Sequence, residues 1–233
     1  MAKPHNSSFI SQVATVAAKD LRSELRSKEA INASLSFALV ILLLFSFAFE
    51  PTAETTREIA GGLLWLVFAF AGALILNRSF ARELQNDCLD ALIASPLSGA
   101  SLFLGKTIAN FVLLLAIELV CLPVFGIFYN ISTMTRHLGP LLLTLALATW
   151  GLTVIGTMFS ALTVNLRLRE LMLPTLVYPV MIPGLMAAIR LTTPLVAGAP
   201  LDNELMVWLR LLVAFDLIFT ALAATLVETV LVG

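Results

Sequence analysis

Three carboxylates stand at helical spacing near the middle of the chain: Glu83, Asp87 and Asp90. At about 100° per residue they share one narrow arc of a helix. A separate arc of the same helix carries apolar side chains, namely Phe80, Leu84, Cys88, Ala91 and Leu92. Residues 80 to 95 are therefore predicted to form a short helix that displays its acids to a soluble partner and ends before Pro96. A solvated interfacial loop without a partner is the alternative that periodicity alone leaves open.

Nucleotide chemistry is a second candidate, because Gly99, Gly105, Lys106 and Thr107 resemble the phosphate-binding pattern G-x-x-x-x-G-K-[ST]. Five residues separate the two glycines instead of four, and the stretch opens a lipid-spanning segment instead of following a strand. A phosphate cradle is therefore not expected, and any energy source must be a separate subunit or a gradient. The apolar segments also hold no H-E-x-x-H, no G-x-S-x-G and no paired aspartates, so an intramembrane enzyme is not favoured.

The cysteine count and the net charge narrow the remaining classes of site and partner. Cys88 and Cys121 stand far apart without a C-x-x-C motif, which argues for neither a disulfide framework nor a zinc site. A net charge of -1 argues against nucleic acid as a partner. No catalytic residue, no cofactor-binding residue and no metal ligand is predicted on this chain.

The elements that must position the acidic segment are apolar helices. Hydrophobic residues make up 59% of the chain, charged residues 12%, and the mean hydropathy is +0.97, which is typical of a membrane protein. A helix needs roughly 20 apolar residues to cross the bilayer. Six segments qualify and predict an all-α integral membrane domain over residues 30–233. They run approximately from Ala30 to Phe49, Ile59 to Leu76, Leu102 to Phe128, Leu138 to Val164, Leu171 to Leu191, and Trp208 to Val232.

Basic residues predict the orientation of these spans, since Lys and Arg favour cytoplasmic loops. The loops on one side, together with the N-terminal segment, hold more of them than the loops on the other side. Both termini, the acidic segment and residues 1–29 are therefore expected in the cytoplasm. Within residues 1–29 an apolar stripe beside charged residues predicts an interfacial helix, with an ordinary charged tail as the alternative. The stripe consists of Ile10, Val13, Ala17, Leu21 and Leu25.

Several residues inside the predicted spans are unusual for lipid. Glu118 lies in the middle of the third span, where a charged carboxylate costs about 2.5 to 3.5 kcal/mol. It is either a residue of a translocation path or dimer interface, or an acid bonded to a neighbouring helix. Pro179 and Pro183 interrupt the fifth span and mark a kink, a hinge or a lining of a dimer cleft. Gly156 and Ser160 have the small-x-x-x-small spacing that allows close helix contact.

Two blocks of residues resemble a known family. The first consists of Glu83-Leu84-Gln85, Leu89-Asp90, Leu92, Pro96-Leu97 and Lys106. The second consists of Ala161-Leu162-Thr163-Val164 with Arg167, followed by Leu176 to Pro183. Together they are similar to the CcmB family, the permease subunit of the cytochrome c maturation haem exporter and a branch of the ABC-2-type permeases. The chain departs from the family pattern at Asp87 and Ser98, at Asn110 in the third span, and at Arg169-Glu170.

The resemblance implies a homodimeric permease that docks on two copies of an ATP-binding subunit, with ATP and Mg²⁺ on that partner. It also implies haem-handling membrane partners, haem as a possible cargo, and the bacterial inner membrane as the location. Residues 80–95 would be the coupling helix, with Glu83, Asp87 and Asp90 meeting the ATPase and Arg167 and Arg169 forming a second contact. Leu84, Leu92 and Pro96 complete this predicted interface.

Two other functions are compatible with the same residues. An ABC-2 permease for a lipid, a glycan or a drug would share the coupling helix, and a channel or membrane scaffold would lack the ATPase. The only histidines that could be axial haem ligands are His5, in the predicted cytoplasmic tail, and His137, in a predicted outer loop. His137 is on the plausible side for haem, but a lone histidine in a loop is usually solvated, so ligation is not expected.

Overall fold

The computed structural model describes residues 8–49, 54–80, 98–163, 166 and 168–232, with backbone only for residues 54–57, 169 and 228–232. These ranges are helical and contain no strand. In chain order the helices are α1 (Phe9–Ser27), α2 (Glu29–Ala48), α3 (Glu54–Leu76), α6 (Gly99–Phe128), the 3-10 helix η1 (Ser132–His137), α7 (Leu138–Thr163), α8 (Arg169–Val196) and α9 (Asn203–Val232).

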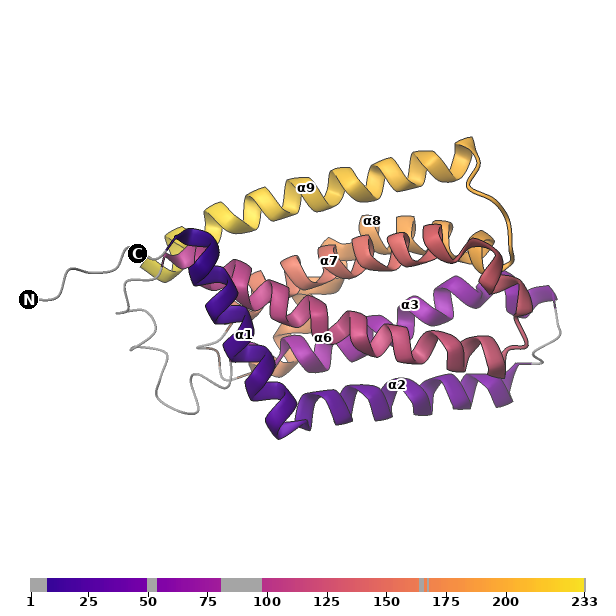
Figure 1. Cartoon of the computed structure of the whole chain (residues 1–233), viewed down its shortest axis with the longest axis horizontal. Coiled ribbons are helices and arrows are strands. Elements are labelled where there is room, and N and C mark those ends of the chain that lie inside the picture. Colours follow the sequence, from indigo (N-terminus) through magenta and orange to yellow (C-terminus); the bar gives the residue numbers. More distant parts are fainter. Residues whose placement is uncertain (1–7, 50–53, 81–97, 164–165, 167, 233) are drawn as a thin grey trace, which may run out of the picture.

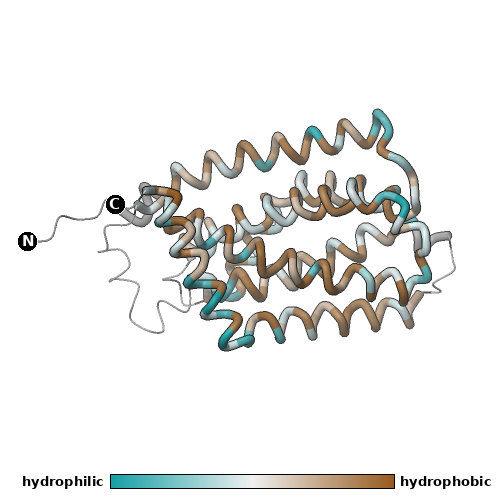
Figure 2. Tube along the Cα trace, viewed as in Figure 1, coloured by the Kyte–Doolittle hydropathy of each residue, from teal (hydrophilic) through white to brown (hydrophobic). Residues whose placement is uncertain are grey.

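Six of the described helices are long and apolar enough to cross a membrane, which confirms the predicted all-α membrane fold. Apolar residues dominate along these helices (Figure 2). The fifth and sixth spans are longer than predicted, because α8 continues to Val196 and α9 already begins at Asn203. Polar residues such as Thr192 and Glu204 lower the local hydropathy, so hydropathy alone ends the fifth span too early and begins the sixth span too late. α8 also continues as one helix through Pro174, Pro179, Pro183 and Pro194.

The six spans run side by side, and α1 crosses one end of them (Figure 1). That end, called the α1 end below, also holds the last turns of α3, the start of α6 and the end of α9. α7 lies inside the bundle, where it contacts α3, α6, α8 and α9. Its residues Leu145, Leu152 and Ile155 are fully buried in the main apolar core. The α1 end is therefore where the segment between α3 and α6 is attached.

The predicted small-residue pair on α7 makes the close contact expected of it. Gly156 packs against the side chain of Leu76, and an added Cβ would collide with it. The hydroxyl of Ser160 donates to the carbonyl oxygen of Leu76 at 2.9 Å. The end of α3 is thus held directly on α7, because small residues let two helices approach closely.

α1 turns into α2 within a single residue. Lys28 has the left-handed conformation, with φ 57° and ψ 9°, and breaks the helical path between Ser27 and Glu29. The buried carboxylate of Glu24 accepts hydrogen bonds from the backbone N–H groups of Ala30, at 2.8 Å, and Ile31, at 3.4 Å. It thereby satisfies N–H groups that have no partner in the first turn of α2. The corner between α1 and α2 is therefore fixed by a side chain of α1.

Candidate functional site

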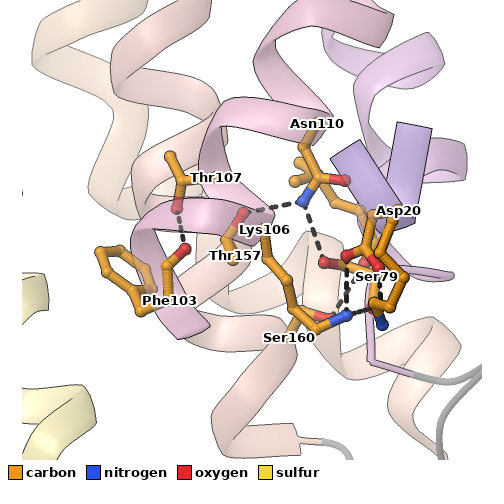
Figure 3. Close-up of polar contacts among 10 residues, drawn as sticks. Asp20, Ser79, Phe103, Lys106, Thr107, Asn110, Thr157 and Ser160 are labelled. Carbon is orange, nitrogen blue, oxygen red and sulfur yellow. Dashed lines mark hydrogen bonds and ion pairs between the residues drawn. The ribbon is translucent and has the colours of Figure 1, made fainter. Parts of the chain in front are cut away.

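Lys106 is buried in the second turn of α6, with an exposed fraction of 1%. Its ammonium donates to Oδ2 of Asp20 at 3.0 Å and to the carbonyl oxygen of Ser79 at 2.7 Å. The nitrogen also lies 4.7 Å from the ring centroid of Phe80 (Figure 3 shows the polar contacts). A buried ammonium needs such partners, because leaving it unpaired in a low-dielectric site is costly. Lys106 thus joins α1, α6 and the turn after α3.

Asn110 extends this arrangement by one helical turn. Residues four apart on a helix share a face, so Asn110 lies beside Lys106. Its side-chain amide donates to the hydroxyl oxygens of Ser79 and Thr157, both at 2.9 Å (Figure 3). Because Thr157 belongs to α7, Asn110 of α6 connects the turn after α3 to α7.

We call Asp20, Ser79, Phe80, Lys106, Asn110 and Thr157 the root cluster. The name reflects their place around Ser79 and Phe80, the last described residues before the segment 81–97. The other end of that segment is also held, because the hydroxyl of Ser98 accepts from the backbone N–H of Ser101 at 3.1 Å and caps α6. Such a cap typically contributes about 1 kcal/mol to helix stability. Both attachment points of residues 81–97 are therefore defined by side-chain contacts.

The approach of α1 to α6 depends on Gly105. A Cβ on this residue would lie 2.6 Å from Cβ of Val16 and 3.0 Å from the carbonyl oxygen of Val13. The glycine next to Lys106 therefore lets the backbone of α1 come close enough for Asp20 to reach the ammonium. The stretch that resembles a phosphate loop is helical here, and Thr107 donates to the carbonyl oxygen of Phe103 at 2.9 Å. A helix cannot form a loop cradle, which agrees with the prediction.

Most of the predicted coupling residues lie outside the described residues, namely Glu83, Leu84, Asp87, Asp90, Leu92, Pro96 and Arg167. Arg169 begins α8, and its side chain is outside them as well. Phe80, the first residue of the predicted helix, lies in the turn that follows α3, and residues 81–95 of that prediction lie outside the described residues. The ring of Phe80 is fully buried beside Lys106.

The two acids in the middle of the spans differ in their partners. Glu118 is fully buried, and the hydroxyl of Thr149 on α7 lies 2.7 Å from each of its carboxyl oxygens. Asp216 of α9 is 5% exposed, and neither of its carboxyl oxygens has a hydrogen-bond partner among the described residues. Asp216 faces Gly151 of α7, where an added Cβ would lie 2.5 Å from Oδ1. Both acids thus face α7 within the chain.

Pro179 and Pro183 lie on the outer side of α8, and both are exposed. They are separated from Glu118, which packs between α6 and α7. The structure therefore does not bring together the three residues predicted for a translocation path or dimer interface.

Sequence reasoning missed the ion pair between Asp20 and Lys106. Lys106 stands within α6, and its partner Asp20 lies on α1. A usable signal was the polar pair Lys106 and Asn110, spaced four apart at the start of an otherwise apolar helix. That signal predicts a polar contact on one face but does not identify the partner. Among the described residues, no three His, Cys, Asp or Glu side chains are grouped as a metal site would require.

Comparison with known proteins identifies the family. The CcmB protein family model matches residues 11–230. Heme exporter protein B of Pseudomonas aeruginosa is 31% identical over 199 residues, which cover 85% of this chain and 87% of that protein. Heme exporter protein B of Rhodobacter capsulatus is 31% identical over 167 residues, which cover 72% of this chain and 76% of that protein. The protein of the same name from Paracoccus denitrificans is 30% identical over 185 residues, covering 78% and 82%. With its six apolar spans and a family match over nearly its whole length, the chain belongs to the CcmB protein family.

Proposed function

We propose that this chain is the membrane-spanning permease subunit of an ABC-type exporter that serves haem delivery in cytochrome c maturation. Its family and the name of its relatives, Heme exporter protein B, support haem as the cargo. Six spans and the helical course of Gly99 to Thr107 support a transport subunit that takes its energy from a separate ATPase. The chain itself is non-catalytic and carries no cofactor, while ATP and Mg²⁺ bind to the partner.

The root cluster supports this proposal most directly, because its contacts connect the residues that precede the segment 81–97 to α1, α6 and α7. Residues 81–95 dock on the ATPase through Glu83, Asp87 and Asp90. Movement of this segment pulls on Ser79 and Phe80, which are bonded to Lys106 and Asn110 of α6. Asp20 passes the movement to α1 and Thr157 passes it to α7. A small displacement at the α1 end is thus shared by elements that pack as rigid helices.

The assembly follows from the same proposal. Two copies of the chain form a dimer on two ATP-binding subunits, and haem-handling membrane subunits complete the complex. The chain lies in the bacterial inner membrane with the α1 end and both termini in the cytoplasm. The bases Lys19, Arg22, Arg26 and Arg78 at the α1 end support this orientation, since basic residues favour the cytoplasmic side.

Charge reversal tests the coupling. We expect the triple variant E83K/D87K/D90K to lose copurification with the ATP-binding subunit and to lose stimulated ATP turnover. The three acids are proposed to meet a basic groove on that subunit, and lysines in their place would be repelled by it. A matched control reverses two exposed acids toward the opposite end, as E58K/E204K, and should keep both properties. Unchanged copurification and ATP turnover in the triple variant would remove the coupling proposal.

The cargo is tested separately on the purified complex. An absorption scan should detect haem in the complex and a decrease in bound haem when ATP is hydrolysed. A complex that hydrolyses ATP but retains a lipid or a glycan instead of haem would retain the permease proposal and overturn the cargo.

A further inference from the structure

The charges of α1 are sorted by sign between its inner and outer sides. Both of its acids are used within the chain. Asp20 bonds the ammonium of Lys106 at 3.0 Å and that of Lys19 at 2.8 Å, while Glu24 caps the first turn of α2. The acidic charge of α1 is therefore compensated internally and contributes little to its outer face.

The bases of α1 lie together on the outer face. At 100° per residue, Lys19, Arg22 and Arg26 fall within an arc of about 60°. All three are exposed, and the two arginines follow each other at the four-residue spacing that places side chains on one face. The outer arc of α1 is thus a basic stripe, called the Arg22–Arg26 stripe below.

A third arc lies between the buried side of α1 and the Arg22–Arg26 stripe, and it is apolar. Ile10 and Leu25 fall on this arc and are 75% and 58% exposed. α1 crosses one end of the apolar spans, and hydrophilic residues gather at its junction with α2 (Figures 1 and 2). The ends of helices that span a bilayer lie at the level of the polar headgroups. An exposed apolar arc beside a basic arc is the pattern of a helix that lies in a membrane interface.

We propose that α1 is a binding site for anionic phospholipid headgroups of the phosphatidylglycerol kind. Arg22 and Arg26 contact the lipid phosphate, because the planar guanidinium matches phosphate geometry with paired hydrogen bonds. Ile10 and Leu25 insert between acyl chains of the same leaflet. A base near an anionic membrane surface contributes roughly a fivefold change in binding. Neither the ATPase coupling nor the cargo enters this proposal, so it stands or falls independently of them.

The test compares lipid retention by matched variants of the full chain. The protein is reconstituted in nanodiscs with equal amounts of phosphatidylcholine and phosphatidylglycerol, released into detergent and examined by native mass spectrometry. We expect R22Q/R26Q to retain roughly 25-fold less phosphatidylglycerol than the unchanged protein, at about fivefold for each base, and R22K/R26K to lose less. The control R190Q/R210Q removes two exposed arginines nearer the opposite end and should retain the lipid.

Two further arms separate headgroup binding from its alternatives. Inorganic phosphate at millimolar concentration should not displace the lipid, because it lacks the acyl chains that Ile10 and Leu25 contact. The variant I10S/L25S should therefore weaken retention while the arginines remain. Equal phosphatidylglycerol retention by R22Q/R26Q and the unchanged protein overturns the proposal. Displacement of the lipid by inorganic phosphate alone also overturns the proposal. A loss of phosphatidylglycerol in R190Q/R210Q equal to that in R22Q/R26Q overturns it as well. Stoichiometric retention of an acidic protein on the Arg22–Arg26 stripe, abolished by R22Q/R26Q, would also overturn it.

Discussion

The two ends of the bundle are joined by different kinds of interaction. At the α1 end, Lys106 is buried against Asp20, and Arg78 pairs with Glu29 at 2.7 Å. Near the opposite end, the described side-chain hydrogen bonds between helices join neutral groups. The hydroxyl of Tyr129 donates to the carbonyl oxygen of Leu42 at 3.2 Å, and that of Thr133 donates to Val196 at 2.9 Å.

The two ends also differ in how α3 is held. Near the opposite end, α3 crosses α8 at Gly61, where an added Cβ would lie 2.9 Å from the backbone nitrogen of Thr193 and 3.0 Å from the carbonyl oxygen of Ile189. Backbone atoms cannot rotate aside as side chains do, so this crossing is rigid. The α1 end instead holds the turn after α3 through long side chains. Both ends thus contain a close glycine crossing, at Gly61 and at Gly105, and the α1 end adds ionic and amide links around the attachment of residues 81–97.

The largest effect is expected when the ionic link at the α1 end is broken. The substitution D20A removes the carboxylate bonded to the buried Lys106 and should lower the free energy of unfolding by about 3 kcal/mol, the low end for a buried pair, because Ser79 still accepts from the ammonium. Denaturant titration in mixed micelles measures this change. D20N should cost less, and E204A, an exposed acid near the opposite end, should have no effect. Equal stability of D20A and the unchanged protein would contradict the ionic account.

The rigid crossing near the opposite end is tested by two adjacent glycines. G61A places a methyl group against the backbone of α8 and should cost about 2 kcal/mol through overpacking. The matched control is G62A, because nothing lies within 4 Å of a Cβ at Gly62. The same mixed-micelle titration should separate the two variants. If G62A were as destabilising as G61A, the crossing would not be responsible, because Ala favours a helix over Gly and a Cβ at Gly62 meets nothing within 4 Å.

Asp216 lies between the two ends, and its removal is expected to raise the free energy of unfolding instead of lowering it. Replacing it by leucine, which has a similar branched shape, removes a buried carboxyl without a hydrogen-bond partner among the described residues. D216L should therefore raise the free energy of unfolding by about 1 to 2 kcal/mol. E118L is the comparison, because it removes an acid bonded to Thr149 and should not stabilise. A loss of stability in D216L would indicate that the carboxyl gains a partner in the membrane.

The smallest effect is expected from a single neutral hydrogen bond near the opposite end. T133V keeps the shape of the side chain and removes the hydroxyl that donates to the carbonyl oxygen of Val196. The expected cost is about 1 kcal/mol, well below that of D20A. T135V is the control, since the hydroxyl of Thr135 is exposed and bonds only within η1, to Ser132. A cost of T133V equal to that of D20A would erase the distinction between the two ends.

Local patterns predicted the elements well. Each apolar span is a property of about 20 consecutive residues, so hydropathy alone located all six. Gly156 and Ser160 were recognised as a close-contact pair because their spacing is also local. The coupling residues Glu83, Asp87 and Asp90 stay a prediction, because they lie outside the described residues.

The pairing of polar side chains was decided by tertiary structure alone. Lys106 and Asp20 are 86 positions apart, and Glu118 and Thr149 are 31 apart. Nothing in the local sequence of either residue states how its helix is rotated or which helix it will face. By itself the sequence determined six apolar helices, an amphipathic α1 and the acids and bases between them. The packing of rigid helices fixes the rotation and the depth of each helix to within one side chain. Only this packing decided that Lys106 is bound, while Asp216 lacks a hydrogen bond among the described residues.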